Sequence, residues 1–219
     1  IVDAEQCNFH AIYLRYYRSI VAVADLHEAV QITSGIPHSA LSPTYLDQVK
    51  KLLGRSVAAG DTSSSERLLS ILHTVMRVDE FAPIGFAVAD ALRARGEYGL
   101  TARIYGSLSR AQHMLLRERA LLWAGYSSAV AGDLNQAELV LETVSELQRD
   151  NPNFLTYCLA KGRLYMAFGD HGKALRYLSR AMVLASVNAS YKPELYYLLI
   201  RCHRRSGEGE AAQRLYNEL

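Results

Sequence analysis

Cysteine is scarce in this chain and is not arranged as a disulfide framework or a metal site. The three cysteines, Cys7, Cys158 and Cys202, are odd in number and far apart, and no CxxC pair occurs. Disulfide-stapled domains use an even number of cysteines, and structural zinc sites need closely spaced ligands. We therefore predict three small hydrophobic side chains in a reducing compartment, which favours the cytoplasm.

The chain also lacks long apolar runs and a large excess of charge of either sign. No segment approaches the ~20 consecutive apolar residues of a membrane span, and nothing resembles a secretory signal. The first residue is Ile, which suggests a processed or excised piece of a longer chain. With 24 basic and 22 acidic residues, the formal net charge is +2. This balance makes nucleic acid an unlikely primary partner, because phosphate contacts require concentrated positive charge.

Catalytic and cofactor-binding signatures are absent from the sequence. HExxH, GxSxG and GxxxxGK[ST] do not occur, and the seven histidines are scattered. Only Cys202 and His203 are neighbours, and adjacent residues of a helix point to different sides, so they do not form a ligand pair. We therefore predict a non-enzymatic protein without a metal or a cofactor.

The chain is 50% hydrophobic, which is ample material for a core. It also contains a repeat. A small residue followed by an acid recurs at intervals of 36, 36, 36, 37 and 38 residues, as Ala24-Asp25, Gly60-Asp61, Gly96-Glu97, Gly132-Asp133, Gly169-Asp170 and Gly207-Glu208. Glycine adopts the left-handed conformation that ends a helix, and an acid favours the positive N-terminus of the next helix. Each pair therefore predicts a tight turn inside a helical hairpin.

Small side chains at fixed distances from these turns predict close contact between the two helices of each hairpin. Five residues after the turns stand Ala29, Ser65, Thr101, Ala137, Ala174 and Ala212, and in the third unit Ala102 is an alternative contact residue. Seven residues before the turn, the first helix carries Gly125 in the fourth unit and Gly162 in the fifth. The predicted first helices cover 8–24, 44–60, 83–96, 118–132, 155–169 and 194–207.

These positions resemble the tetratricopeptide repeat (TPR). The fifth unit carries the resemblance through Gly162, Tyr165, Gly169-Asp170, Ala174, Leu178 and Ala181. The fourth carries it through Gly125, Gly132-Asp133, Ala137, Leu141 and Val144, and the last through Tyr196, Gly207, Ala212 and Tyr216. The N-terminal half departs from the pattern, since Ser65 and Thr101 replace the usual alanine. Trp123 lies two residues later than the tryptophan of the family.

The resemblance implies an all-α fold, a right-handed superhelical solenoid of about six antiparallel helix pairs. It implies a single domain over 1–219, with units at about 8–40, 44–78, 83–112, 118–149, 155–187 and 194–219. In such solenoids the first helices line a concave groove that receives a segment of a partner protein. The expected function is therefore that of a scaffold, adaptor or chaperone-like subunit in complex assembly.

The register of the turns predicts which side chains face that groove. The set is basic with interleaved apolar and aromatic residues, namely Arg93, Arg119, Leu122, Tyr126, Arg163, Met166, Tyr197, Arg201, Arg204 and Arg205. Arginine and tyrosine are enriched at binding hot spots, so the set favours an acidic or C-terminal-carboxylate segment as the ligand. The alternative is that these arginines only solvate a helix face.

Three further functions stay open. One is an RNA-binding module of the pentatricopeptide kind, although no base-reading residues recur. Another is a regulatory domain of a larger enzyme or transcription regulator. The third is self-association through the terminal repeats, where Tyr13, Tyr16, Tyr17, Tyr196 and Tyr197 gather.

Overall fold

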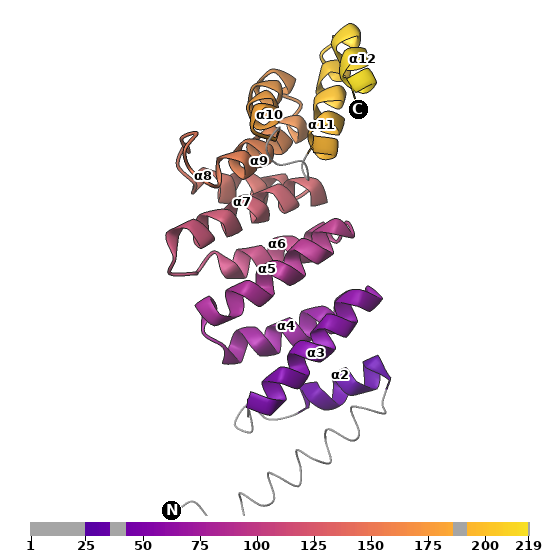
Figure 1. The fold of residues 1–219 in the computed structure, drawn as a ribbon, viewed down its shortest axis with the longest axis vertical. Coiled ribbons are helices and arrows are strands. Elements are labelled where there is room, and N and C mark those ends of the chain that lie inside the picture. The colour runs from indigo at the N-terminus through magenta and orange to yellow at the C-terminus, as the bar shows by residue number, and fades with distance from the viewer. Residues whose placement is uncertain (1–24, 36–42, 186–191, 219) are drawn as a thin grey trace, which may run out of the picture. The chain divides into compact units, whose positions relative to one another are not determined.

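The structure is a computed structural model that describes residues 25–35, 43–185 and 192–218. These residues form eleven α-helices and no β-strand, which confirms the prediction of an all-α fold (Figure 1). The chain divides into two compact units, residues 1–84 and residues 85–219, and each is described by itself. The predicted helix 8–24 and its tyrosines lie outside the described residues.

The first unit is built on one helical hairpin with a short helix beside it. It contains α2 (Leu26–Ser34), α3 (Pro43–Ala59), α4 (Thr62–Val75) and the start of α5 (Val78–Ala94). Leucines of α3 and α4 form its core, and the hydroxyl of Tyr45 on α3 donates a 2.7 Å hydrogen bond to the carbonyl of Thr33 on α2.

The second unit continues the pattern from α5 onward with successive helical hairpins. Its further helices are α6 (Tyr98–Leu108), α7 (Met114–Ala131), α8 (Leu134–Glu142), α9 (Phe154–Ala167), α10 (His171–Ala185), α11 (Lys192–Arg205) and α12 (Gly209–Glu218). Within each hairpin α7 packs on α8, α9 on α10 and α11 on α12, and between hairpins α6 packs on α7 and α10 on α11. Figure 1 shows these pairs following one another in chain order.

The five glycine–acid turns have the conformation that the sequence predicts. Their glycines, Gly60, Gly96, Gly132, Gly169 and Gly207, all have positive φ, between 75° and 89°. The aspartate after the glycine then caps the second helix. Asp61, for example, accepts a 3.0 Å hydrogen bond from the backbone N–H of Ser64. Glu97 makes no such bond, although it stands at the same position. The third hairpin therefore lacks a side-chain cap that its neighbours have.

The predicted small side chains are buried at the helix–helix contacts. All six positions from Ala29 to Ala212 are at most 2% exposed, and in the third unit the contact residue is Thr101, since Ala102 is only partly buried. The hydroxyl of Ser65 lies 2.9 Å from that of Ser56 on the facing helix, and Thr101 donates to the carbonyl of Glu97 at 2.7 Å. Buried hydroxyls are tolerated in these units because each has a hydrogen-bond partner.

Helix boundaries differ from the predicted ones in the third and fourth units, where α7 also begins at Met114, four residues before the predicted start. Pro83 was expected near the start of a first helix, but α5 begins at Val78 and contains Pro83 in its interior. In the fourth unit α8 ends at Glu142, and a non-helical segment follows to Asn153. Valine and leucine of this segment are buried, and the side-chain amide of Asn153 donates to the Leu115 carbonyl at 3.0 Å. Packing against α7 thus holds the segment without a helix.

Candidate functional site

The predicted binding residues all lie in the second unit, on α5, α7, α9 and α11. Two of them are not on the surface, because Leu122 is 0% exposed and Tyr126 is 3% exposed. Helix α7 is packed against α6, α8 and α9 together, so most of its circumference is core. Burial therefore corrects the prediction that Leu122 and Tyr126 face a partner. The other residues separate into two groups with different electrostatic surroundings.

In the first group, Arg119 is already paired with a carboxylate. Its guanidinium lies 3.3 Å from Asp90 on α5 and 4.7 Å from the centre of the Phe86 ring. Asp90 also accepts a 2.5 Å hydrogen bond from the hydroxyl of Tyr105, a side chain with no exposed surface. Burial, with help from Asp90, strongly raises the pKa of Tyr105, so this hydroxyl keeps its proton. These contacts fasten α5 to α6 and α7.

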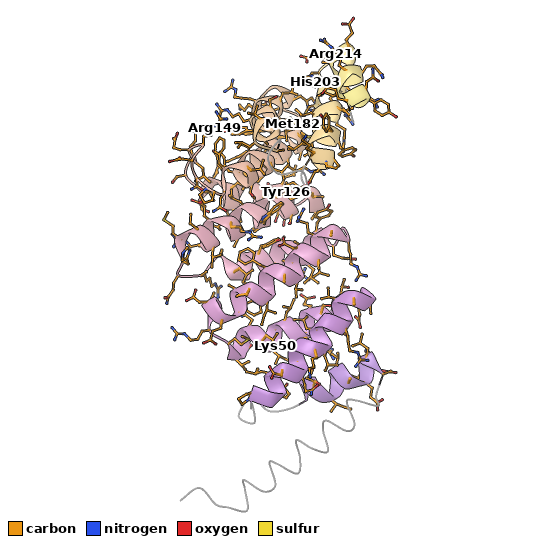
Figure 2. The ribbon with its side chains drawn as sticks, in the orientation of Figure 1. Lys50, Tyr126, Arg149, Met182, His203 and Arg214 are labelled. Carbon is orange, nitrogen blue, oxygen red and sulfur yellow. The ribbon has the colours of Figure 1, made fainter. Side chains whose placement is uncertain are left out.

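Arg93 belongs to the same group. Its guanidinium stacks on Trp123 at 4.2 Å from the ring centre, and the Trp123 ring also meets Tyr126 edge to face. The hydroxyl of Tyr126 donates to Glu194 in the first turn of α11; Figure 2 labels Tyr126 on α7. Arg93 in turn acts electrostatically on Glu194. The Trp123 ring and the nearby Glu194 carboxylate thus already interact favourably with the positive charge of Arg93.

Glu194 sits in surroundings that disfavour its charge. Burial raises its pKa, and the positive charge of Arg93 only partly offsets this. Because the folded-state pKa lies above that of an unfolded glutamate, the folded state binds more protons between the two values. The free energy of unfolding therefore falls as pH rises through this window, and the cost is fully present above the folded-state pKa.

We expect Glu194→Gln to raise the free energy of unfolding by about 1 kcal/mol at pH 7 and to have little effect below pH 4. The amide oxygen still accepts the bond from Tyr126, while the desolvated charge is gone. Urea unfolding at both pH values measures the difference, and Glu142→Gln, on the exposed face of α8, is the matched control. A loss of stability at pH 7 would show instead that attraction to Arg93 outweighs desolvation.

The second group differs in having no carboxylate partner among the described residues. Arg163 on α9 is partly buried, and its Nε is a buried atom without a hydrogen-bond partner, as is the Nε of Arg93. Burial lowers the pKa of its guanidinium, and the charge of Arg201 on α11 lowers it further, against opposing effects of Tyr197 and Tyr98. Arg201 donates a 3.0 Å hydrogen bond to the hydroxyl of Tyr197, which is 54% exposed. We call Arg163, Tyr197 and Arg201 the α9–α11 basic face.

The remaining predicted residues lie around this face. Met166 is half-buried one turn along α9 from Arg163, and Arg204 and Arg205 are exposed near the end of α11. On the same helix His203 lies 2.7 Å from Glu208 across the turn to α12 (His203 is labelled in Figure 2). Within the part of the chain that the structure describes, no carboxylate lies within ion-pair distance of Arg163 or Arg201.

Sequence reasoning missed Glu194 and the role of Trp123. An acid in the first turn of a helix is common for its effect on the helix dipole, so Glu194 carries no signal of a long-range contact. Only the structure shows that Glu194 on α11 accepts a hydrogen bond from the hydroxyl of Tyr126 on α7. The described residues contain no group of three or more histidine, cysteine or carboxylate side chains that could hold a metal ion. None of the described helices is both long and apolar enough to span a membrane.

Comparison with solved structures places the fold among the TPR proteins. A tetratricopeptide repeat protein from Parabacteroides merdae matches 95% of this chain and 78% of its own length, with a TM-score of 0.55 and 15% identity. A structure described as the nearly identical TPR-like repeats of a Podosopora anserina kinesin light chain matches 87% of this chain and 100% of its own length, with a TM-score of 0.49 and 16% identity. No protein-family model matches the sequence, and neither does any curated protein. The first likeness confirms the predicted TPR-like solenoid as the fold.

Proposed function

We propose that this chain is a protein-binding module that holds an extended acidic segment of a partner against the α9–α11 basic face. Stacked helical hairpins present long surfaces and are widely used as scaffolds, which is an argument from the fold alone. The site supplies the second argument. Of the predicted arginines, Arg119 is ion-paired with Asp90 and Arg93 acts electrostatically on Glu194, whereas the charged group that acts on Arg163 is another arginine, Arg201.

The observation that carries the proposal is that α9 and α11 are in contact and each carries an arginine that, among the described residues, has no carboxylate within ion-pair distance. Arg201 is near enough to Arg163 to lower its pKa, so each charge disfavours the other. An anion bound near them would reduce that repulsion. Tyr197 adds an exposed aromatic ring 5.5 Å from the Arg201 guanidinium, a combination typical of binding hot spots.

Binding of a fluorescein-labelled hexaglutamate peptide to the full chain tests this function. We expect anisotropy to show binding that weakens as salt rises, and Arg201→Glu to weaken it about tenfold, since a bound charge pair becomes a repulsive one. Arg180→Gln is the matched control, because Arg180 also stacks on a tyrosine, Tyr177, but lies on α10. Circular dichroism confirms that each variant is folded.

Two results would overturn the proposal. One is hexaglutamate binding that Arg201→Glu leaves unchanged, because the basic face would then not be the site. The other is tighter binding of a single-stranded oligouridine than of hexaglutamate, which would favour an RNA-binding module.

A further inference from the structure

A hollow of about 440 Å³ is lined by residues of α6, α7 and α8, at the place where α6 and α8 both pack on α7. Half of the residues that line it are glycine or alanine, namely Gly99, Ala102, Gly106, Ala124 and Ala131. A Cβ atom on Gly99 or on Gly106 would meet no atom of the described residues within 4 Å, so the space above both glycines is open. We call this space the α6–α8 hollow.

The hollow exists because the third hairpin has small side chains where the next hairpin has long ones. Ala102 and Gly106 stand six and ten residues after their turn glycine, Gly96. At the same distances from its own turn glycine, the fourth unit carries Glu138 and Glu142. Both glutamates are exposed, so this face of a second helix accepts long side chains. The fold therefore does not require the hollow to be empty.

A buried hydroxyl in the hollow indicates what an occupant must bring. Ser128 of α7 lines the hollow and is only 4% exposed, and no hydrogen bond joins its hydroxyl to another described residue. Ser56 and Ser65, which are buried between α3 and α4, do bond to each other, at 2.9 Å. A hydroxyl left without a partner is costly once water is excluded. Whatever covers the hollow must therefore supply a hydrogen-bond acceptor to Ser128.

A side chain suited to the hollow stands on the same surface. Leu139 of α8 is 62% exposed, and it directly precedes Val140, which lines the hollow. One exposed leucine is ordinary, but a leucine beside an open hollow makes the surface complementary to itself. Around a two-fold axis the leucine of each chain enters the hollow of the other, and such a contact closes at two chains. We infer that two copies of this chain form a dimer in which Leu139 of each occupies the α6–α8 hollow of the other.

The charges on α6 and α8 agree with this pairing. Residues two apart in a helix lie on opposite sides of it, so Glu138 and Glu142 lie on the flank of α8 opposite to Val140. In a two-fold pair the flanks that line the hollows face each other, and the glutamate flank of each α8 faces α6 of the other copy. That helix carries Arg103, which lines the hollow. A glutamate can therefore pair with this arginine and accept the proton of the Ser128 hydroxyl.

Sedimentation equilibrium on the full chain tests the dimer. The average mass should rise towards that of two chains, and no further, as the protein concentration is raised. Leu139→Glu should raise the dissociation constant at least ~100-fold, because two buried leucines are lost from each dimer. Met114→Glu is the matched control and should leave the constant unchanged, since Met114 is equally exposed, at 62%, but does not line the hollow.

Filling the hollow gives a second, independent variant. Gly106→Glu introduces the side chain that the fourth unit carries at the same distance from its turn, and it should also raise the dissociation constant ~100-fold or more. Arg103→Glu should weaken the dimer about tenfold, and adding Glu138→Arg and Glu142→Arg to the same chain should restore most of that loss, because the charges are then exchanged across the contact. Circular dichroism confirms that each variant is folded.

Three results would overturn the inference. One is a chain that stays monomeric up to the highest concentration at which it is soluble. Another is a dimer that both Leu139→Glu and Gly106→Glu leave intact, because a different surface would then hold it together. The third is growth beyond two chains, which would show an open-ended contact instead of a two-fold one. Neither variant should change hexaglutamate binding, so the inference and the proposed function stand or fall separately.

Discussion

Replacing Gly125 by valine is expected to lower the free energy of unfolding of the second unit by about 3 kcal/mol. A Cβ atom at this position would lie 2.4 Å from Cγ of Leu141 and 2.7 Å from its Cδ2. Leu141 has no exposed surface, so it cannot turn out into solvent to make room. The clash involves the branch point of a packed leucine, and α7 and α8 must separate to relieve it.

Trp123 makes the effect measurable in the second unit alone. It is the one tryptophan of the chain and lies in α7, next to the substituted position. Urea and thermal unfolding followed by its fluorescence should show a midpoint lowered by about 10 °C, given the expected energy. Gly106→Ala is the matched control. Gly106 is also helical, but a Cβ there meets nothing within 4 Å, so alanine should preserve or slightly raise stability.

A double substitution distinguishes the clash from a general intolerance of valine in α7. Leu141→Ala alone should cost about 3 kcal/mol, since it opens a cavity. Combined with Gly125→Val, it removes the atoms that clash and the new side chain fills part of the space. The pair should therefore cost clearly less than the sum of the two single changes. Additive losses would refute close packing of Gly125 on Leu141.

Gly125 and Gly162 were identifiable from the sequence because their role depends on local spacing. Each lies seven residues before a turn glycine, and that spacing alone places it opposite the next helix of the same hairpin. The structure confirms this for both, since a Cβ on Gly162 would lie 2.6 Å from Cδ2 of Leu178. Turns and hairpin contacts are short-range features, so one sequence is enough to predict them.

The electrostatic surroundings of the arginines were not predictable in the same way. Register alone placed Arg93, Arg119, Arg163 and Arg201 in one surface. Whether each is compensated depends on side chains far away in the sequence, such as Asp90 for Arg119, 29 residues apart. Tyr126 and Glu194 are 68 residues apart, in different hairpins. Repeat spacing carries no information on such pairs, because each occurs once and is not part of the repeat.

Trp123 also makes contacts that repeat spacing does not predict, and its removal should have the other large effect on stability. Trp123→Ala is expected to lower the free energy of unfolding of the second unit by about 4 kcal/mol. The ring is 1% exposed, stacks on Tyr105 and carries the Arg93 guanidinium on its face. Alanine therefore leaves a large cavity between α6 and α7 and removes a cation–π contact. Unfolding followed by far-ultraviolet circular dichroism measures the loss, since the fluorophore is gone.

Trp123→Phe is the informative companion, because it keeps an aromatic face beneath Arg93 with a smaller ring. We expect it to cost about 1–2 kcal/mol, and Arg93→Gln to cost less in that background than in the original chain, because phenylalanine binds a cation more weakly. Trp123→Phe should also leave affinity for the hexaglutamate peptide unchanged, since Arg93 belongs to the compensated group. A loss of peptide affinity in Trp123→Phe would place Arg93 in the binding surface and contradict the division of the arginines into two groups.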